Sequence, residues 1–336
     1  MKISASIFSD SEKNILTTID NLNSYHVDVI HVDCKNRFSI FDDIKTIREN
    51  STLPIDLHII TENPEAYYPG IIEYNIDYVT FQYEDLKEKN LTIPSEYKGK
   101  LGIGITTSTD ISVFENYKDS FDFILMMATI PGESGGKFDK SNFTKIREFS
   151  QLYPEKKIHV DGGVNAEVSF ILRNMGVYLS VSGSYLFNSV SIGSALLNLK
   201  LNEIESHFLV KDFMQKTDSS PIINSKDLTL ESLLLTFKNG ALGFAIINDE
   251  NGKFAGIIGN ADLRNGLLKH VNDLNSLNMR ELINPNPLVI NENINVHEML
   301  QFIKKQTKPV IYLPVVNNDN KTVGVVSFLN LIKGEL

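Results

Sequence analysis

The sequence has a single cysteine, no excess of positive charge and no long hydrophobic run, and each absence excludes a class of protein. Cys34 alone cannot form an internal disulfide framework or an all-thiolate metal site, which suits a reducing cytoplasm. Without a run of about 18 apolar residues, we expect no membrane-spanning helix. The N-terminal segment also turns polar too early for a secretory signal. The 32 Lys and Arg residues against 42 Asp and Glu leave a net charge of −10, which argues against electrostatic binding of nucleic acid. We therefore expect a soluble, cytoplasmic protein without membrane or nucleic-acid partners.

Residues 1–205 show the alternation of strands and helices that is typical of a parallel sheet. The chain of 336 residues exceeds one ordinary core and suggests two domains. Amphipathic stretches such as 11–25 and 141–153 separate most of the apolar runs, and eight such units favour a (β/α)8 TIM barrel. A doubly wound open sheet is the alternative, but no Gly-rich phosphate turn follows the first strand. The expected strands are 2–8, 27–33, 55–60, 78–83, 101–106, 121–127, 157–163 and 179–184.

Residues 206–336 contain an internal repeat. FAIINDENGKFAGIIGNADL (244–263) and YLPVVNNDNKTVGVVSFLNL (312–331) each read as a strand, a polar turn, a second strand and a helix start. Their glycines, Gly256 and Gly324, are 324 − 256 = 68 residues apart. Two units of about 212–272 and 278–336, each too small to bury its own core, predict an α+β domain built as a pseudo-twofold pair.

Four polar side chains stand at the predicted ends of barrel strands. His31 and Asp33 are two residues apart in one strand and therefore share a face. His58 follows in the next strand, and Asp161 ends the strand KIHVD. Together they form a mixed nitrogen and oxygen set suited to Zn, Mn or Fe. The alternative interpretation of each is an ordinary polar strand terminus.

Glycine-bearing turns follow three of the predicted strands, at 131–138, 162–165 and 181–184. Backbone N–H groups in such loops can bind an anion, and the loops after the last two strands of a barrel often hold phosphate. Glycine also serves ordinary tight turns, which is the alternative for each loop.

The segments SASIFS, VIHVDCKN, DLHIITENPEAY, MATIPGESGGKF, VDGGVN and VSGSYLF follow one another in an order and spacing that resembles the ribulose-phosphate 3-epimerase family over about residues 1–200. The resemblance implies a metal-dependent isomerase that inverts C3 of a phosphorylated ketose, by default D-ribulose 5-phosphate to D-xylulose 5-phosphate. It implies that Asp33 and Asp161 are the catalytic acid and base, acting through a cis-enediolate. The implied metal ligands are His31, Asp33, His58 and Asp161. The implied substrate-binding residues are Ser6, Gly135, Gly162, Gly163, Gly183 and Ser184.

Three departures from the family pattern leave the substrate open. Lys35 stands where the family has a methionine, within the run Cys34–Arg37. Gln82 and Glu84 stand where the family usually reads His-x-Glu, and Glu133 replaces an aromatic residue. Two alternatives therefore remain: an epimerase of another ketose phosphate in a specialised sugar or polysaccharide pathway, and a non-catalytic sensor of sugar phosphate or nucleotide.

The second half resembles a tandem pair of CBS (cystathionine-β-synthase type) domains. The resemblance implies an adenine nucleotide between the repeats and a homo-oligomer, with a purely structural dimerisation module as the alternative. Each predicted nucleotide site is half matched, because the first repeat keeps the motif's aspartate and the second keeps its serine. The implied residues are Asp262, Ser327 and Asn330.

Overall fold

The computed structural model describes residues 1–10, 13–131, 135–200, 207–240, 242–306 and 310–328. The chain divides into two compact units at residues 204 and 205. None of the helices in the described ranges is long and apolar enough to cross a membrane.

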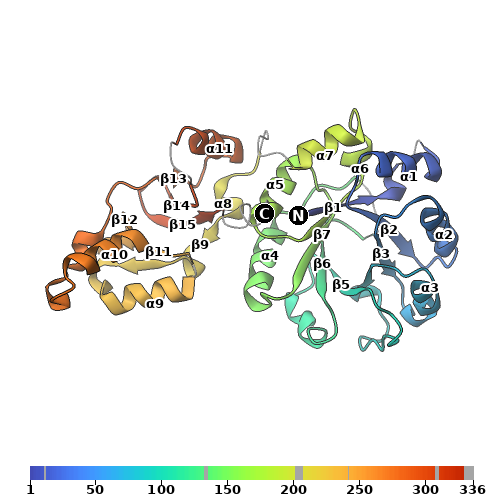
Figure 1. The fold of residues 1–336 in the computed structure, drawn as a ribbon, viewed down its shortest axis with the longest axis horizontal. Coiled ribbons are helices and arrows are strands. Elements are labelled where there is room, and N and C mark those ends of the chain that lie inside the picture. Colours follow the sequence, from blue (N-terminus) through green and yellow to red (C-terminus); the bar gives the residue numbers. More distant parts are fainter. Residues whose placement is uncertain (11–12, 132–134, 201–206, 241, 307–309, 329–336) are drawn as a thin grey trace. The chain divides into compact units, whose positions relative to one another are not determined.

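The first unit is a closed barrel of eight parallel strands. The strands pair in chain order, and β8 pairs with β1 to complete the ring (Figure 1). This result confirms the predicted TIM barrel and excludes the open sheet. The strands are β1 (Lys2–Ser6), β2 (Val29–Lys35), β3 (Ile55–Ile60), β4 (Tyr78–Gln82), β5 (Lys100–Thr106), β6 (Phe123–Met127), β7 (Lys157–Asp161) and β8 (Leu179–Ser182).

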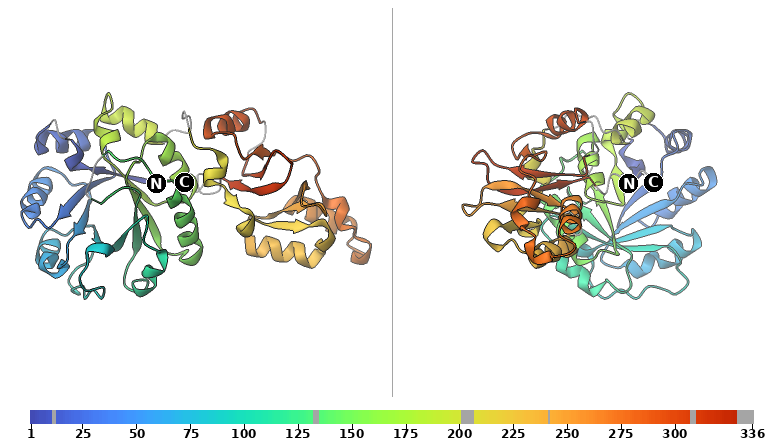
Figure 2. Two further views of the ribbon diagram at one scale, coloured as in Figure 1. Left: turned by 180° about the vertical axis from the view of Figure 1, so that it is seen from behind. Right: turned by 60° about the vertical axis from the view of Figure 1, so that its left-hand side comes forward.

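Helices surround the ring because each carries one apolar face (Figure 2). The second of them buries Ile40, Ile44 and Ile47, which are spaced by four and three residues. After β4 and β5 the described chain forms the 3-10 turns η3 (Tyr83–Asp85) and η4 (Ile111–Asn116). The α-helices are α1 (Ile15–Ser24), α2 (Ile40–Asn50), α3 (Tyr68–Glu73), α4 (Ser141–Leu152), α5 (Ala166–Asn174), α6 (Ser184–Phe187) and α7 (Ile192–Lys200).

The barrel interior contains an uncharged histidine. His159 on β7 is fully buried and stacks on Phe123, with ring centroids 3.9 Å apart. Neither of its ring nitrogens has a hydrogen-bond partner within the described residues. Burial lowers the pKa of His159 to about 3, because the cation would lose its hydration.

His159 should make the barrel sensitive to mild acid. The unfolded chain takes up a proton near pH 6.5 whereas the folded chain resists protonation down to about pH 3, so stability falls as pH falls through this window. Between pH 7 and pH 5 the loss should be about 2 kcal/mol. Urea unfolding of wild type and His159→Leu at both pH values isolates this contribution, and an identical pH dependence of the two proteins would contradict it.

The second unit repeats one small fold twice. In each repeat a short strand pairs in parallel with the next strand, which pairs antiparallel with a third. The first repeat forms the sheet β10-β11-β12, and the second forms β13-β14-β15-β9. Its elements are α8 (Val210–Phe213), β9 (Gln215–Lys216), β10 (Ile222–Asn224), α9 (Leu230–Gly240), β11 (Phe244–Asn248), β12 (Phe254–Gly259), α10 (Asn260–Lys269), β13 (Ile290–Asn291), α11 (Val296–Lys304), β14 (Tyr312–Val316) and β15 (Thr322–Ser327).

The glycines of the repeat permit a close approach of two backbones. A Cβ atom on Gly256 would lie 2.3 Å from the carbonyl oxygen of Asn284, and one on Gly324 would lie 2.2 Å from that of Gln215. In both repeats a segment from outside the repeated motif pairs with the Gly-led strand. The repeats also meet through the stacked rings of Phe244 and Tyr312, whose centroids are 3.5 Å apart. These two residues are likewise 312 − 244 = 68 positions apart, as expected across a pseudo-twofold axis.

Candidate active site

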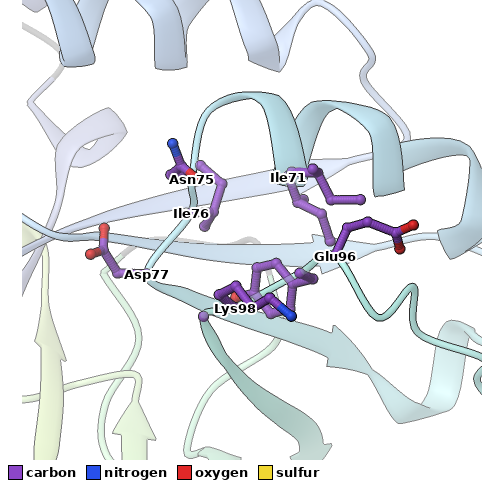
Figure 3. Close-up of a pocket in the computed structure, with 9 residues that line it drawn as sticks. Ile71, Asn75, Ile76, Asp77, Glu96 and Lys98 are labelled. Carbon is purple, nitrogen blue, oxygen red and sulfur yellow. The ribbon is translucent and has the colours of Figure 1, made fainter.

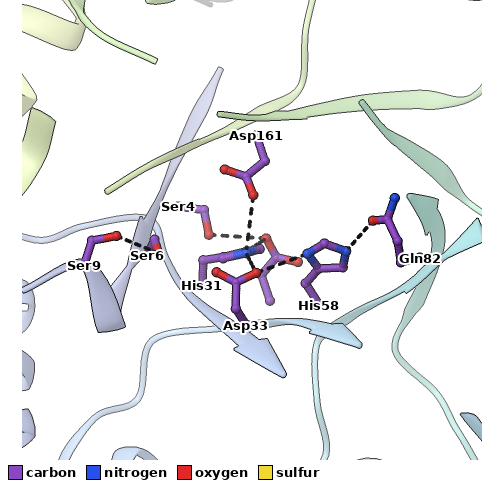
Figure 4. A network of polar contacts seen from close by, with 9 residues as sticks. Ser4, Ser6, Ser9, His31, Asp33, His58, Gln82 and Asp161 are labelled. Atoms are coloured by element: carbon purple, nitrogen blue, oxygen red, sulfur yellow. Dashed lines mark hydrogen bonds and ion pairs between the residues drawn. The ribbon is translucent and has the colours of Figure 1, made fainter. Parts of the chain in front are cut away.

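The four side chains predicted as metal ligands lie together, with His31 and Asp33 on β2, His58 on β3 and Asp161 at the end of β7 (Figure 4). One ligand atom from each lies within 4.8 Å of those from the other three. Both histidines are fully buried, whereas the side chains of Asp33 and Asp161 are 26% and 16% exposed. The imidazoles therefore form the floor of the cluster, and the carboxylates reach the mouth of the barrel.

His31 is oriented by a buried carboxylate. The register of β2 and β3 pairs it with Asp56, whose Oδ2 lies 2.9 Å from His31 Nδ1. The other ring nitrogen, Nε2, lies 3.3 Å from Asp33 Oδ1 and 3.8 Å from Asp161 Oδ2. Although burial opposes protonation, Asp33 and Asp56 hold the pKa of His31 well above its usual value. One nitrogen is thus occupied by Asp56, and the other faces the cluster.

His58 has the opposite arrangement. Its Nδ1 lies 3.1 Å from Asp33 Oδ1, and its Nε2 lies 2.7 Å from the side-chain oxygen of Gln82. Gln82 is fully buried on β4. Each histidine therefore directs one ring nitrogen toward the cluster. The other nitrogen contacts a buried side chain of a neighbouring strand, Asp56 for His31 and Gln82 for His58.

The two carboxylates of the cluster differ in proton affinity. Burial raises the pKa of Asp161 to about 6, and the charge of Asp33 acts in the same direction. At Asp33 burial is overcome by His31 and His58, which hold its pKa well below the usual range. Pairs of carboxyl groups with divergent pKa values can act as acid and base. The donors also fit a divalent cation such as Zn, Mn or Fe, because two imidazole nitrogens and two carboxylates converge without thiolate.

The other predicted substrate-binding residues occupy loops at the same end of the barrel. Ser6 ends β1 and accepts a hydrogen bond from Ser9, 3.1 Å away. A Cβ atom on Gly183 would lie 2.3 Å from Ser9 Oγ, so the loops after β1 and β8 are in contact. Ser184 begins α6. Gly135, Gly162 and Gly163 have positive φ angles of 88°, 106° and 65°. Residues 132–134, which directly precede Gly135 and include Glu133, lie outside the described residues.

The residues predicted to bind nucleotide belong to two different repeats of the second unit. Asp262 Oδ2 accepts a hydrogen bond of 2.8 Å from the backbone N–H of Gly259, at the start of α10. Ser327 ends β15, and Asn330 lies outside the described residues. One oxygen of Asp262 is therefore engaged in capping a helix.

Sequence reasoning missed Asp56 and His159, which lie inside the barrel two residues before His58 and Asp161. The signal was available, because residues i and i+2 of a strand share a face. Only residues near strand ends were considered, although the interior of a barrel is lined along the whole strand. Gln82 was recognised as a departure from the pattern His-x-Glu, in which Glu84 is kept, but neither residue was recognised as a neighbour of a ligand.

A hollow lies at the opposite end of the barrel strands. It has a volume of about 200 Å³ and is lined by Ile71, Ile76, Tyr97 and neighbouring residues that precede β4 and β5 (Figure 3). Catalytic groups of TIM barrels stand at the carboxyl ends of the strands, whereas the amino ends serve stability. By this rule the expected place for catalytic groups is the end of the barrel that holds Asp161, and not this hollow.

Comparisons with known proteins show which families the two parts of the chain resemble. The model of the ribulose-phosphate 3 epimerase family matches residues 2–187, and that of the CBS domain matches residues 279–335. The ribulose-phosphate 3-epimerase of Bacillus subtilis (strain 168) is 27% identical over 213 residues, which cover 60% of this chain and 98% of the relative. That of Methanocaldococcus jannaschii is 27% identical over 232 residues, covering 66% and 97%. Among solved structures, CBSX2 in complex with AMP is 21% identical, covers 38% of this chain and 96% of its own, and has a TM-score of 0.32.

Proposed function

This chain belongs to the ribulose-phosphate 3-epimerase family, whose members are isomerases, and on that basis we propose that it inverts C3 of a ketose phosphate. D-ribulose 5-phosphate is the substrate that we expect by default. The observation that carries the proposal is the pair of carboxyl groups, Asp33 and Asp161, beside the same two imidazoles but with divergent proton affinities.

Inversion at carbon requires one base to remove a proton and an acid to return it on the other face. The ionised carboxylate of Asp33 or Asp161 removes the C3 proton, and the carboxyl group of the other residue reprotonates the planar enediolate. The pKa of Asp161 near 6 suits a group that carries a proton at neutral pH in one half of the cycle. His31, Asp33, His58 and Asp161 would hold a divalent cation, which would supply positive charge to stabilise the enediolate oxygens.

The phosphate of the substrate is proposed to bind in the loops after β7 and β8. Gly162, Gly163, Gly183 and Ser184 offer backbone N–H groups there, while Ser6 ends the neighbouring strand β1 and Gly135 belongs to the loop after β6. Backbone N–H groups in such loops form anion sites without a basic side chain. Binding at this position would hold the sugar chain across the two carboxyl groups.

Proton NMR in D2O tests the reaction directly. With metal-loaded protein and D-ribulose 5-phosphate, we expect deuterium at C3 and the appearance of D-xylulose 5-phosphate. Absence of both, in folded protein that has bound metal, would overturn the assignment of substrate. The same assay on a panel of other ketose phosphates would then separate an epimerase of altered specificity from a barrel without turnover.

Lys35 gives a specific reason to include that panel. It ends β2 two positions beyond Asp33 and is exposed at the mouth, in register with Ile60 of β3. Its side chain therefore lies on the same inward face as the proposed catalytic aspartate. A cation at this position favours substrates with an oxygen-rich or anionic group near the reacting carbon.

The second unit is a CBS domain pair, and we propose that it binds an adenine nucleotide and regulates the barrel. Support comes from its repeated topology and from Asp262, whose Oδ2 caps α10 while its other oxygen is suited to accept from a ribose hydroxyl. Ser327 and Asn330 are the corresponding residues that we propose in the second repeat.

Adenine nucleotides should therefore raise the melting temperature of this unit. At 100 times the dissociation constant, binding adds about 2.7 kcal/mol to the free energy of unfolding. Asp262→Asn keeps an oxygen acceptor for the helix cap and should weaken the response, and a uridine nucleotide serves as the control ligand. No shift with ATP, ADP or AMP at saturation would favour a structural dimerisation module.

A further inference from the structure

We propose that Glu84 and Gln82 form a hydrogen-bonded relay that fixes the tautomer of His58. In that tautomer the lone pair of Nδ1 faces the proposed metal site formed by His31, Asp33, His58 and Asp161. Gln82 and Glu84 are positioning residues in this proposal, because neither belongs to the cluster itself. The inference rests on the proposed metal site, but its test can be read without turnover.

The relay begins with a carboxylate that can only accept. Glu84 Oε1 accepts hydrogen bonds from the backbone N–H of Thr106 at 2.9 Å, from the Thr106 hydroxyl at 3.1 Å and from the Thr109 hydroxyl. Although burial opposes ionisation, these bonds and that of Gln82 hold the pKa of Glu84 below its usual value. An ionised carboxylate has no proton to donate.

The carboxylate determines which way the Gln82 amide points. Gln82 Nε2 lies 2.5 Å from Glu84 Oε2, and only the NH2 end of the amide can satisfy that contact. The carbonyl Oε1 must then face His58 Nε2 at 2.7 Å. A carbonyl is also an acceptor only, so His58 has to donate from Nε2 (Figure 4). In the neutral imidazole the lone pair is therefore on Nδ1, the nitrogen that faces Asp33.

The surrounding barrel holds the relay in place. Gln82 pairs with Gly104 on β5, and a Cβ atom at that glycine would lie 2.8 Å from Gln82 Oε1. Glycine at this position leaves room for the amide between two strands. On the far side, Lys145 Nζ donates to the carbonyls of Thr106 and Thr109 at 2.8 Å and 2.6 Å, which anchors the loop that binds Glu84.

The relay differs from the direct arrangement at His31. There, the buried carboxylate of Asp56 touches the imidazole and holds Nδ1, leaving Nε2 for the cluster. At His58 the carboxylate of Glu84 acts through the amide of Gln82, which binds Nε2 and leaves Nδ1 for the cluster. Partners of this kind orient metal-binding histidines, and their loss costs about 10- to 100-fold in metal affinity.

Three variants test the relay. Gln82→Met keeps the length of the side chain but removes both polar atoms, and metal titration should show about 10- to 100-fold weaker binding of Zn²⁺. Gln82→His should restore binding, because imidazole can donate to Glu84 and accept from His58. Glu84→Gln should act in the same direction as Gln82→Met, since its oxygen stays with the backbone N–H of Thr106 and its NH2 group then faces Gln82, which turns the Gln82 amide over. Gln151→Met, at an exposed position of α4, is the matched control.

Nitrogen-15 NMR of the ring nitrogens in metal-free protein reads the tautomer of the neutral imidazole itself. Wild type and Gln82→His should show the proton on Nε2 only, and Glu84→Gln should shift the proton to Nδ1. Wild-type zinc affinity in Gln82→Met, or a neutral His58 with its proton on Nδ1 in wild type, would overturn the relay. These readouts stay valid if the proposed sugar phosphate is wrong, so the two proposals can fail separately.

Discussion

Asp161→Asn should abolish epimerisation while leaving the barrel folded. The amide has the size of the carboxyl group but can neither take up nor deliver the transferred proton, and it is a weaker cation ligand. General acid–base catalysis alone contributes about 10²- to 10⁴-fold, so we expect turnover to fall by about 10³-fold or more. In the metal-free form the variant should not lose stability through this change, because it removes one of two like charges that share a buried cluster.

The same variant separates the two proton transfers. Asp33 remains in this variant and can still remove and return the C3 proton of the epimer whose C3–H points toward it. The opposite face has lost the carboxyl group that would reprotonate C3 with inversion. Incubation of each epimer with the variant in D2O should therefore give deuterium at C3 in at most one epimer, with no inversion in either. Asp20→Asn, at an exposed position of α1, controls for handling. Near-normal interconversion by Asp161→Asn would refute the assignment of acid and base.

The barrel could be predicted from the sequence because its strands are short apolar runs at regular intervals. Each of the eight predicted strands overlaps an observed one, and the ring closes in chain order. The site residues on these strands could also be predicted, since the period-two alternation of a strand places His31 and Asp33 on one face. The resemblance to the epimerase and CBS families is confirmed by the matches to residues 2–187 and 279–335.

What could not be predicted depends on contacts between strands. The role of Gln82 follows from Glu84 beside it and from Gly104 across the sheet, and a single sequence does not contain that register. Gly256 illustrates the same limit. The repeat drew attention to it, but the backbone that approaches it belongs to Asn284, outside the repeated motif. Patterns within one strand or helix could be predicted from the sequence. The residue on another element that contacts a given side chain could not.

Removal of the divalent metal should also abolish turnover, and it should weaken the barrel itself. Without a cation, the carboxylates of Asp33 and Asp161 share a partly buried space and are compensated there by the imidazoles of His31 and His58. An ion that binds the folded state alone adds about 2.7 kcal/mol at 100 times its dissociation constant. Exhaustive chelation should therefore lower the melting temperature of the barrel and remove activity, and Mn, Fe or Zn should restore both.

His31→Gln distinguishes this effect from a general response to the chelator. It removes one of the four donors, so the metal-dependent rise in melting temperature should be largely lost, while a chelator should change the variant little. Because Asp56 then faces an amide instead of an imidazole, the comparison is made between metal-loaded and metal-free forms of the same variant, which cancels that cost. Activity that is indifferent to complete metal removal, measured by elemental analysis of the same sample, would refute the metal site and leave the two aspartates to act alone.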